Sequence, residues 1–169
     1  MNDSEFQNIK EKLLDGEYLL AINKAYARQF FMYSDLAPNA DKILISCFYY
    51  LSYLFFFLAV IVAGFAFGYG ALLAIPLSCL FFAGFWSDAS KNGRIATVIL
   101  SALIIAVMLF FFSSQLQYVF AGLLGVSLIC VYLLYMLSSI RFSSLAIGAK
   151  ENFDIMVNQS PDECVSIKN

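Results

Sequence analysis

The serine whose neighbours come closest to a catalytic motif is Ser127, which stands after a glycine in Gly125-Val126-Ser127. A hydrolase serine sits in a Gly-x-Ser-x-Gly turn and is activated by a base, most often a histidine. Here the second residue after the serine is Ile129 instead of glycine, and the chain has no histidine. The pattern predicts a small residue at a helix contact, and we expect this protein not to be an enzyme.

Cysteine is the other residue type that could bind a metal in this chain. The four cysteines form no Cys-x-x-Cys pair, and three of them fall within apolar stretches; they are Cys47, Cys79, Cys130 and Cys164. A zinc site combines cysteine with histidine or more cysteine at close spacing. We therefore expect the three apolar-stretch cysteines to act as small apolar side chains, with no metal or cofactor bound.

The elements that would position these residues are long apolar stretches. Between residues 43 and 139 only Asp88, Lys91 and Arg94 are charged, and they share one short gap. Hydrophobic residues make up 62% of the chain, against about 45–50% in soluble domains. Runs of about 18 or more apolar residues can cross a hydrocarbon core of about 30 Å as helices. The sequence predicts an all-α membrane protein with four transmembrane helices in two hairpins, at about residues 43–67, 69–86, 95–112 and 116–138.

The charge distribution excludes several classes of membrane protein. No Asp, Glu, Lys, Arg or His falls within a predicted span. Ion-coupled carriers and voltage sensors carry such groups inside the membrane. The net charge is −2 and no basic patch is present, so a nucleic-acid partner is not expected.

The positions of Lys and Arg predict the topology. All ten lie in the N-terminal flank (residues 1–42), the gap between the second and third spans, or the C-terminal flank (residues 140–169). Four spans put these three segments on one side, and an excess of Lys and Arg marks the cytoplasmic side. We expect both termini to be cytoplasmic in a plasma membrane, the inner membrane if the source is bacterial.

Amphipathic helices are expected in both flanks. Ser4 and Gln7 have the spacing of a capping box, and Asp15-Gly16 predicts a break. A second helix is predicted from about Glu17 to the Ala37-Pro38 region, with apolar residues at spacings of three and four. These residues form the candidate partner-binding stripe: Leu19, Ile22, Tyr26, Phe30 and Tyr33.

The stripe has several possible contacts. It could lie on the membrane surface, dock on the transmembrane helices, bind a partner, or pack on the C-terminal flank of its own chain. That flank has a second apolar stripe, made of Phe142, Leu145, Ala149, Phe153 and Met156. Residues 158–169 are polar, and we expect them to be frayed.

Within the spans, Pro76 is the candidate hinge, because proline removes a helical hydrogen bond. Faces of small residues on spans one, two and four favour close helix contacts and make a homo-oligomer plausible. Several copies could bring hydroxyl groups around a shared axis, and this set forms the candidate pore lining: Ser46, Tyr49, Tyr53, Ser127 and Tyr132.

Two functions follow from these patterns. The first is a small non-enzymatic interaction, sensor or effector subunit, such as an immunity, exclusion or defence protein, whose cytoplasmic helices bind a protein partner. The alternative is a homo-oligomeric pore or permeability protein, and a small-molecule carrier is a weaker alternative. The surrounding partners would be the lipid bilayer, other copies of the chain and a cytoplasmic protein.

Overall fold

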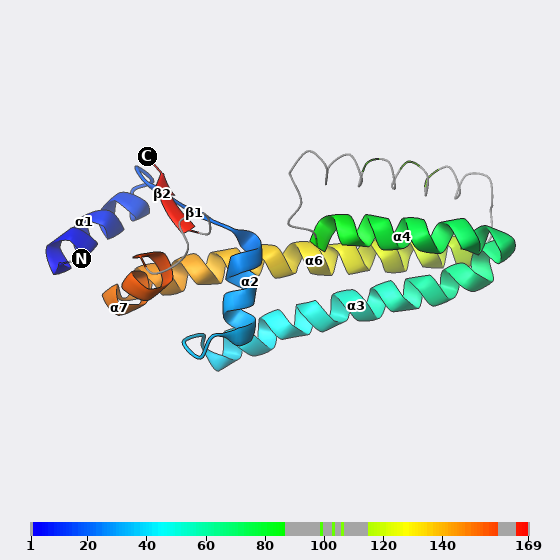
Figure 1. Cartoon of the computed structure of the whole chain (residues 1–169), viewed down its shortest axis with the longest axis horizontal. Helices are drawn as coiled ribbons and strands as arrows, with labels where there is room; N and C mark the ends of the chain where they lie inside the picture. Colours follow the sequence, from blue (N-terminus) through cyan, green and yellow to red (C-terminus); the bar gives the residue numbers. More distant parts are fainter. Residues whose placement is uncertain are drawn as a thin grey trace. The chain divides into compact units, whose positions relative to one another are not determined.

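The computed structural model describes residues 2–86, 115–158 and 165–168, together with the single residues 99, 103 and 106 (Figure 1). It is mostly helical and divides into two compact units. The first unit combines Met1–Ser46 with Leu134–Asn169, and the second is Cys47–Leu133. The charged gap at 87–94 and most of the predicted span at 95–112 lie outside the described residues.

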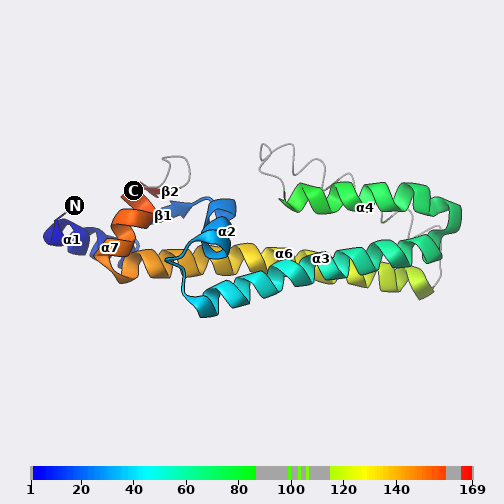
Figure 2. The same ribbon diagram turned by 60° about the horizontal axis from the view of Figure 1, so that its bottom comes forward.

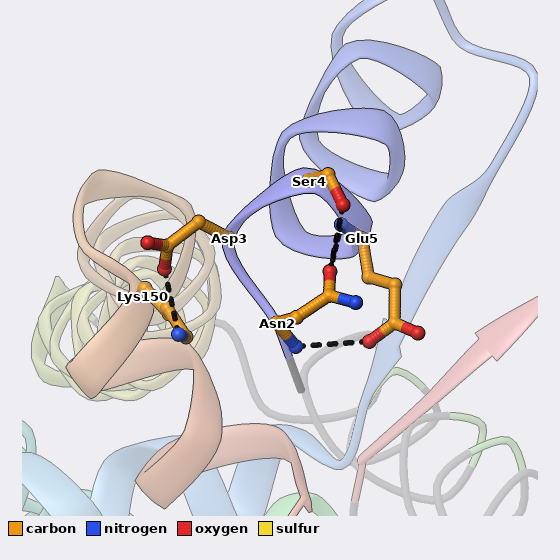
Figure 3. Close-up of polar contacts among 5 residues, drawn as sticks. All are labelled: Asn2, Asp3, Ser4, Glu5 and Lys150. Carbon is orange, nitrogen blue, oxygen red and sulfur yellow. Dashed lines mark hydrogen bonds and ion pairs between the residues drawn. The ribbon is translucent and has the colours of Figure 1, made fainter.

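Helix α1 (Asp3–Leu14) begins at a capping box whose first residue, Asn2, lies two positions before the predicted Ser4. The side chain of Asn2 accepts a 2.7 Å hydrogen bond from the backbone N–H of Glu5, whose carboxylate accepts one from the backbone N–H of Asn2 (Figure 3). The prediction of Ser4 as the cap is wrong, because Asn2 already occupies that position and Ser4 donates to its side chain. The predicted break is confirmed, since Gly16 has φ +77°, which glycine adopts without strain.

The second predicted helix starts later than expected. Residues Leu19–Ile22 form strand β1, which pairs antiparallel with β2 (Val165–Lys168). Helix α2 (Lys24–Tyr33) begins only after Asn23, whose side chain accepts from the backbone N–H of Ala25 at 2.9 Å. The prediction of a helix from Glu17 is therefore wrong for β1, and the prediction of a frayed tail is wrong for β2. Long-range strand pairing outweighed the local helical spacing at β1 and the polar composition at β2.

Helix α3 (Asn39–Phe67) ends at the residue predicted for the first span and begins four residues earlier than that span. The 3-10 turn η1 (Gly68–Gly70) follows, with Gly68 at φ +51°. Helix α4 (Ala71–Trp86) contains Pro76 and ends where the second span was predicted to end. A glycine-containing turn thus joins the first two predicted spans.

Helix α6 (Gln115–Gly148) continues the fourth predicted span into the C-terminal flank without a break. The chain then becomes extended at Ala149 before the short helix α7 (Lys150–Phe153) and the π-helical turn η2 (Asp154–Asn158). The long helix therefore ends at Gly148. Three of the five residues of the C-terminal stripe, Phe142, Phe153 and Met156, are buried.

In the second unit, α3 and α6 pack antiparallel through small residues. Ser127 on α6 donates a 2.8 Å hydrogen bond to the carbonyl of Ser52 on α3, and Gln117 donates a 3.4 Å bond to the carbonyl of Ala66. Ala59 and Ala63, on the same face of α3, are fully buried. Side chains this small let two helix backbones approach closely, as predicted for this face.

Two helical segments are long and apolar enough to cross a membrane. One runs from Asn39 to Leu80, through α3, η1 and the first part of α4, and the other is α6. The buried share of their most apolar windows is 28% and 33%, respectively. Most residues of these windows are therefore not fully buried within the chain.

Candidate functional site

The first unit joins the two polar flanks of the chain around the ring of Phe142. This ring is fully buried and meets two rings of α2 edge to face: Tyr26 at 5.8 Å and Phe30 at 5.3 Å between centroids. Such aromatic pairs add about 0.5–1.5 kcal/mol beyond the area that they bury. Helix α2 crosses the C-terminal part of α6 here instead of running along it (Figures 1 and 2).

Two polar contacts hold the same elements. The guanidinium of Arg28 on α2 lies 5.7 Å from the ring centre of Tyr135 on α6 and donates to its hydroxyl at 3.5 Å. At the start of α3, Asp41 pairs with Arg141 of α6 at 3.5 Å. The side chain of Arg141 is 51% exposed and that of Asp41 is 18% exposed. Solvent therefore screens the pair mainly from the side of Arg141.

The two ends of the chain also meet in this unit. Phe6 of α1 packs edge to face on Phe153 of α7, with centroids 5.6 Å apart. The Nζ of Lys150 donates to the carboxylate of Asp3 at 2.6 Å (Figure 3). This hydrogen bond, helped by the charge of the ammonium, lowers the pKa of Asp3 from its ordinary value, and the same bond raises the pKa of Lys150.

The candidate partner-binding stripe is divided among three places by the structure. Leu19 and Ile22 belong to β1, so the helical stripe predicted from Leu19 to Tyr33 is wrong in its first half. Tyr26 and Phe30 pack on Phe142, which confirms for these two residues the alternative that the stripe packs on the C-terminal flank. Tyr33, at the end of α2, is 77% exposed.

An open groove lies between the end of α2 and the π-helical turn. Its volume is about 460 Å³. The lining side chains are all uncharged: Tyr26, Gln29, Phe30, Tyr33, Ser34, Leu36, Ile155 and Met156. Four of these residues, Tyr26, Phe30, Tyr33 and Met156, belong to the two stripes identified in the sequence. Packing of the first stripe on the C-terminal flank was one of the alternatives, but the groove itself was not predicted.

The residues of the candidate pore lining differ in their exposure and in their contacts. Ser127 is fully buried between α3 and α6, while Tyr132, five positions along the same helix, is 62% exposed. The ring of Tyr53 packs against Tyr49 at 5.1 Å and against Phe82 of α4 at 5.5 Å. Ser46 is half-buried in the first unit. The pore lining itself, which would need several copies of the chain, stays a prediction.

A second, apolar hollow lies at the turn between α3 and α4, beside the candidate hinge. Its volume is about 560 Å³, and it is lined by Gly68, Tyr69, Ala71, Leu72, Ile75 and Pro76. Helix α4 continues through Pro76, and two residues later Ser78 donates a 2.7 Å hydrogen bond to the carbonyl of Ala74. A hinge motion at Pro76 stays a prediction.

Over the residues that the structure covers, no group of three or more cysteine and acidic side chains is arranged to hold a metal ion. Cys47 and Cys79 are exposed, and Cys130 is buried. Cys164 lies outside the described residues. A search of protein-family models, curated proteins and solved structures finds no match to this chain.

Proposed function

We propose that this protein is a non-enzymatic membrane protein with four transmembrane helices, and that its two polar flanks form one cytoplasmic unit that binds a protein partner. The observation that carries the proposal is the joining of both flanks into the first unit. Three lines of argument support it: the apolar surface of the long helices, the parity of the membrane crossings, and the exposed apolar residues on the joined flanks.

The outward surface of the long helices supports a lipid environment. A monomeric soluble protein rarely exposes a continuous apolar patch of more than a few hundred Å². On α3 the exposed large apolar side chains recur at helical spacing: Tyr50, Leu54, Phe57, Leu58, Ile61 and Phe65. On α6 they do so as well: Val119, Val126, Ile129, Tyr132, Met136 and Ile140. Contact of such faces with lipid chains costs no free energy, whereas their exposure to water is unfavourable.

The pairing of the two flanks supports an even number of crossings. Strands β1 and β2 come from opposite ends of the chain, and so do Asp3 and Lys150. Groups that touch must be on the same side of a bilayer, so the chain between them would cross it an even number of times. In the proposed arrangement helices α3, α4 and α6 would make three crossings, and the predicted span at residues 95–112 would make the fourth.

The exposed apolar residues of the joined flanks are the best candidates for contact with a partner. Leu14 at the end of α1 and Leu19 at the start of β1 are each 68% exposed. They are close in sequence, on either side of the Asp15-Gly16 turn. Buried apolar side chains at the centre of an interface supply most of its binding energy. We propose that these two leucines, with the edge of the β1–β2 sheet, form the partner-binding surface.

Site-specific photocrosslinking in native membranes tests this proposal. A photoreactive amino acid replaces Leu14 or Leu19, and the matched control carries it at Ser144, an exposed residue of α6 in the same unit. We expect both leucine positions to give the same adduct with a second protein, and the control position to give none. The absence of any adduct at the leucine positions would contradict the proposal, and adducts of twice the 18.9 kDa chain mass would favour self-association.

The homo-oligomeric pore remains the alternative, with less support from the geometry of one chain because Ser127 is enclosed by α3 and α6. The specific roles in immunity, exclusion or defence, and the weaker alternative of a carrier, stay predictions from the sequence. Ion or dye flux through liposomes that contain the purified protein would favour the pore.

A further inference from the structure

We propose that the groove at the end of α2 holds lipid of the adjoining leaflet, so that α2 lies flat at the membrane surface. This inference rests on the proposed membrane insertion of α3 and α6. It concerns a different surface from the one proposed to bind a protein partner, because Leu14 and Leu19 do not line the groove.

The neighbours of the groove in the first unit include the ion pair of Asp41 with Arg141. Asp41 and Arg141 form an ion pair where the apolar stretches of α3 and α6 end. Phe142 comes one residue after Arg141, which is a rise of about 1.5 Å along a helix. Because Tyr26 and Phe30 of the groove pack on Phe142, the groove lies at the level of that charged pair. Charged pairs at the ends of apolar helices belong in the headgroup region.

The direction of α2 is consistent with a position at the membrane surface. The helix crosses α6 in both views (Figures 1 and 2). If the C-terminal part of α6, which α2 crosses, leaves a bilayer here, α2 is inclined toward the plane of the membrane surface, as interfacial amphipathic helices are. Leu36 follows the end of α2, and α3 begins three residues later at Asn39. The groove is therefore next to the point where the chain enters the apolar region.

The lining has the chemistry of an interfacial lipid contact. It combines tyrosine hydroxyl groups with apolar side chains and contains no charged residue. Tyrosine is enriched at membrane interfaces because its ring is apolar and its hydroxyl is polar. Tyr33 and Leu36, which are 77% and 48% exposed, would place their apolar atoms among acyl chains.

Tryptophan fluorescence in liposomes tests this inference, because Trp86 is the single tryptophan of the chain. In a Trp86→Phe background, Tyr33→Trp reports on the groove, and Leu36→Trp serves as a second reporter if the first variant does not fold. Leu14→Trp is the control on the far part of the same flank. The quenchers are phospholipids brominated near the top of the acyl chain and, from the water side, acrylamide.

We expect the groove reporters to lose most of their emission in brominated liposomes and to be shielded from acrylamide, with the reverse for Leu14→Trp. If Trp86 of the unchanged chain is quenched by brominated lipid but the groove reporters respond only to acrylamide, the lipid groove is wrong while membrane insertion stands. If brominated lipid quenches none of the reporters, including Trp86, both the groove and the membrane proposal are overturned.

Discussion

The hydroxyl of Ser127 donates a 2.8 Å hydrogen bond to the backbone carbonyl of Ser52, and both serines are fully buried between α3 and α6. The residue that most resembled a catalytic serine in the sequence therefore joins two long helices. Its small size matters as much as its hydroxyl, because a larger side chain would push the two backbones apart.

The first prediction follows from this contact. Ser127→Ala should lower the free energy of unfolding by about 1 kcal/mol, through loss of one interhelical hydrogen bond. Ser127→Leu should lower it by about 2 kcal/mol or more, because the added side chain has no space. Denaturant titration in detergent micelles, followed by circular dichroism, measures both. Ser144→Ala on the exposed face of α6 is the control, and equal effects at the two serines would contradict the packing described.

The second prediction concerns the ring cluster of the first unit. Phe142→Ala should destabilise this unit by about 3–5 kcal/mol, because it leaves a cavity beneath Tyr26 and Phe30. Limited trypsin digestion measures the effect, since α2 contains Arg28, and cleavage there should become faster. Ile140→Ala, at a position 52% exposed on the same helix, should leave the digestion rate unchanged. Resistance of the Phe142→Ala variant would show that α2 is held by other contacts.

Much of the helical content could be predicted from the sequence, because long apolar runs and glycine turns act locally. The ends of α3 at Phe67 and of α4 at Trp86 were predicted from this pattern and are confirmed. The strand at Leu19–Ile22 was not, since its spacing fits a helix equally well and its partner at Val165–Lys168 is at the other end of the chain. No local signal identifies such a pairing.

The candidate site could be predicted only in part for the same reason. Tyr26 and Phe30 were identified by their spacing, and packing on the C-terminal flank was among the alternatives. The contact of Arg28 with Tyr135 was missed, because Arg28 lies off the apolar stripe and Tyr135 lay inside a predicted span. The exposed Leu14 was missed because a single apolar residue at a helix end carries no pattern.

A third prediction concerns the ion pair between Asp41 and Arg141. A double-mutant cycle with Asp41→Asn and Arg141→Gln should give a coupling energy of roughly 0.2–1 kcal/mol, since half of the Arg141 side chain is exposed. The coupling should fall at high salt because mobile ions screen exposed charges. Thermal unfolding of the four proteins at two salt concentrations measures it. A coupling unchanged by salt would indicate that the pair is shielded from water.

The fourth prediction is a pH dependence at the ends of the chain. The pKa of Asp3 is lowered from 3.8, so the contact with Lys150 is fully present above that value and is lost as pH falls through the lower, folded pKa. The pKa of Lys150 is raised from 10.5, so the contact is also lost as pH rises through the higher, folded pKa. NMR titration of the Asp3 carboxyl carbon measures the shift, and Lys150→Gln should return it toward 3.8. If that variant titrates like the original chain, the hydrogen bond is not its cause.

The fifth prediction is the side of the membrane on which the turn after α3 lies. Tyr69 is 96% exposed in η1, which directly follows the 29 residues of α3. A helix of that length is about 44 Å long at a rise of 1.5 Å per residue. That length exceeds a hydrocarbon core of about 30 Å. In a background with the four native cysteines replaced by alanine, Tyr69→Cys should react with a membrane-impermeant maleimide added outside intact cells.

Two control positions are needed to interpret this labelling experiment. Leu14→Cys, on the joined flanks, should react only after the cells are opened, because both flanks would be cytoplasmic. Gln115→Cys, at the first residue of α6, should behave like Tyr69→Cys, since an even number of crossings places both hairpin ends outside. Labelling of Tyr69→Cys only in opened cells, or release of the whole protein by a carbonate wash without detergent, would contradict the four-helix arrangement. The apolar faces of α3 and α6 would then have to be covered by protein instead of lipid.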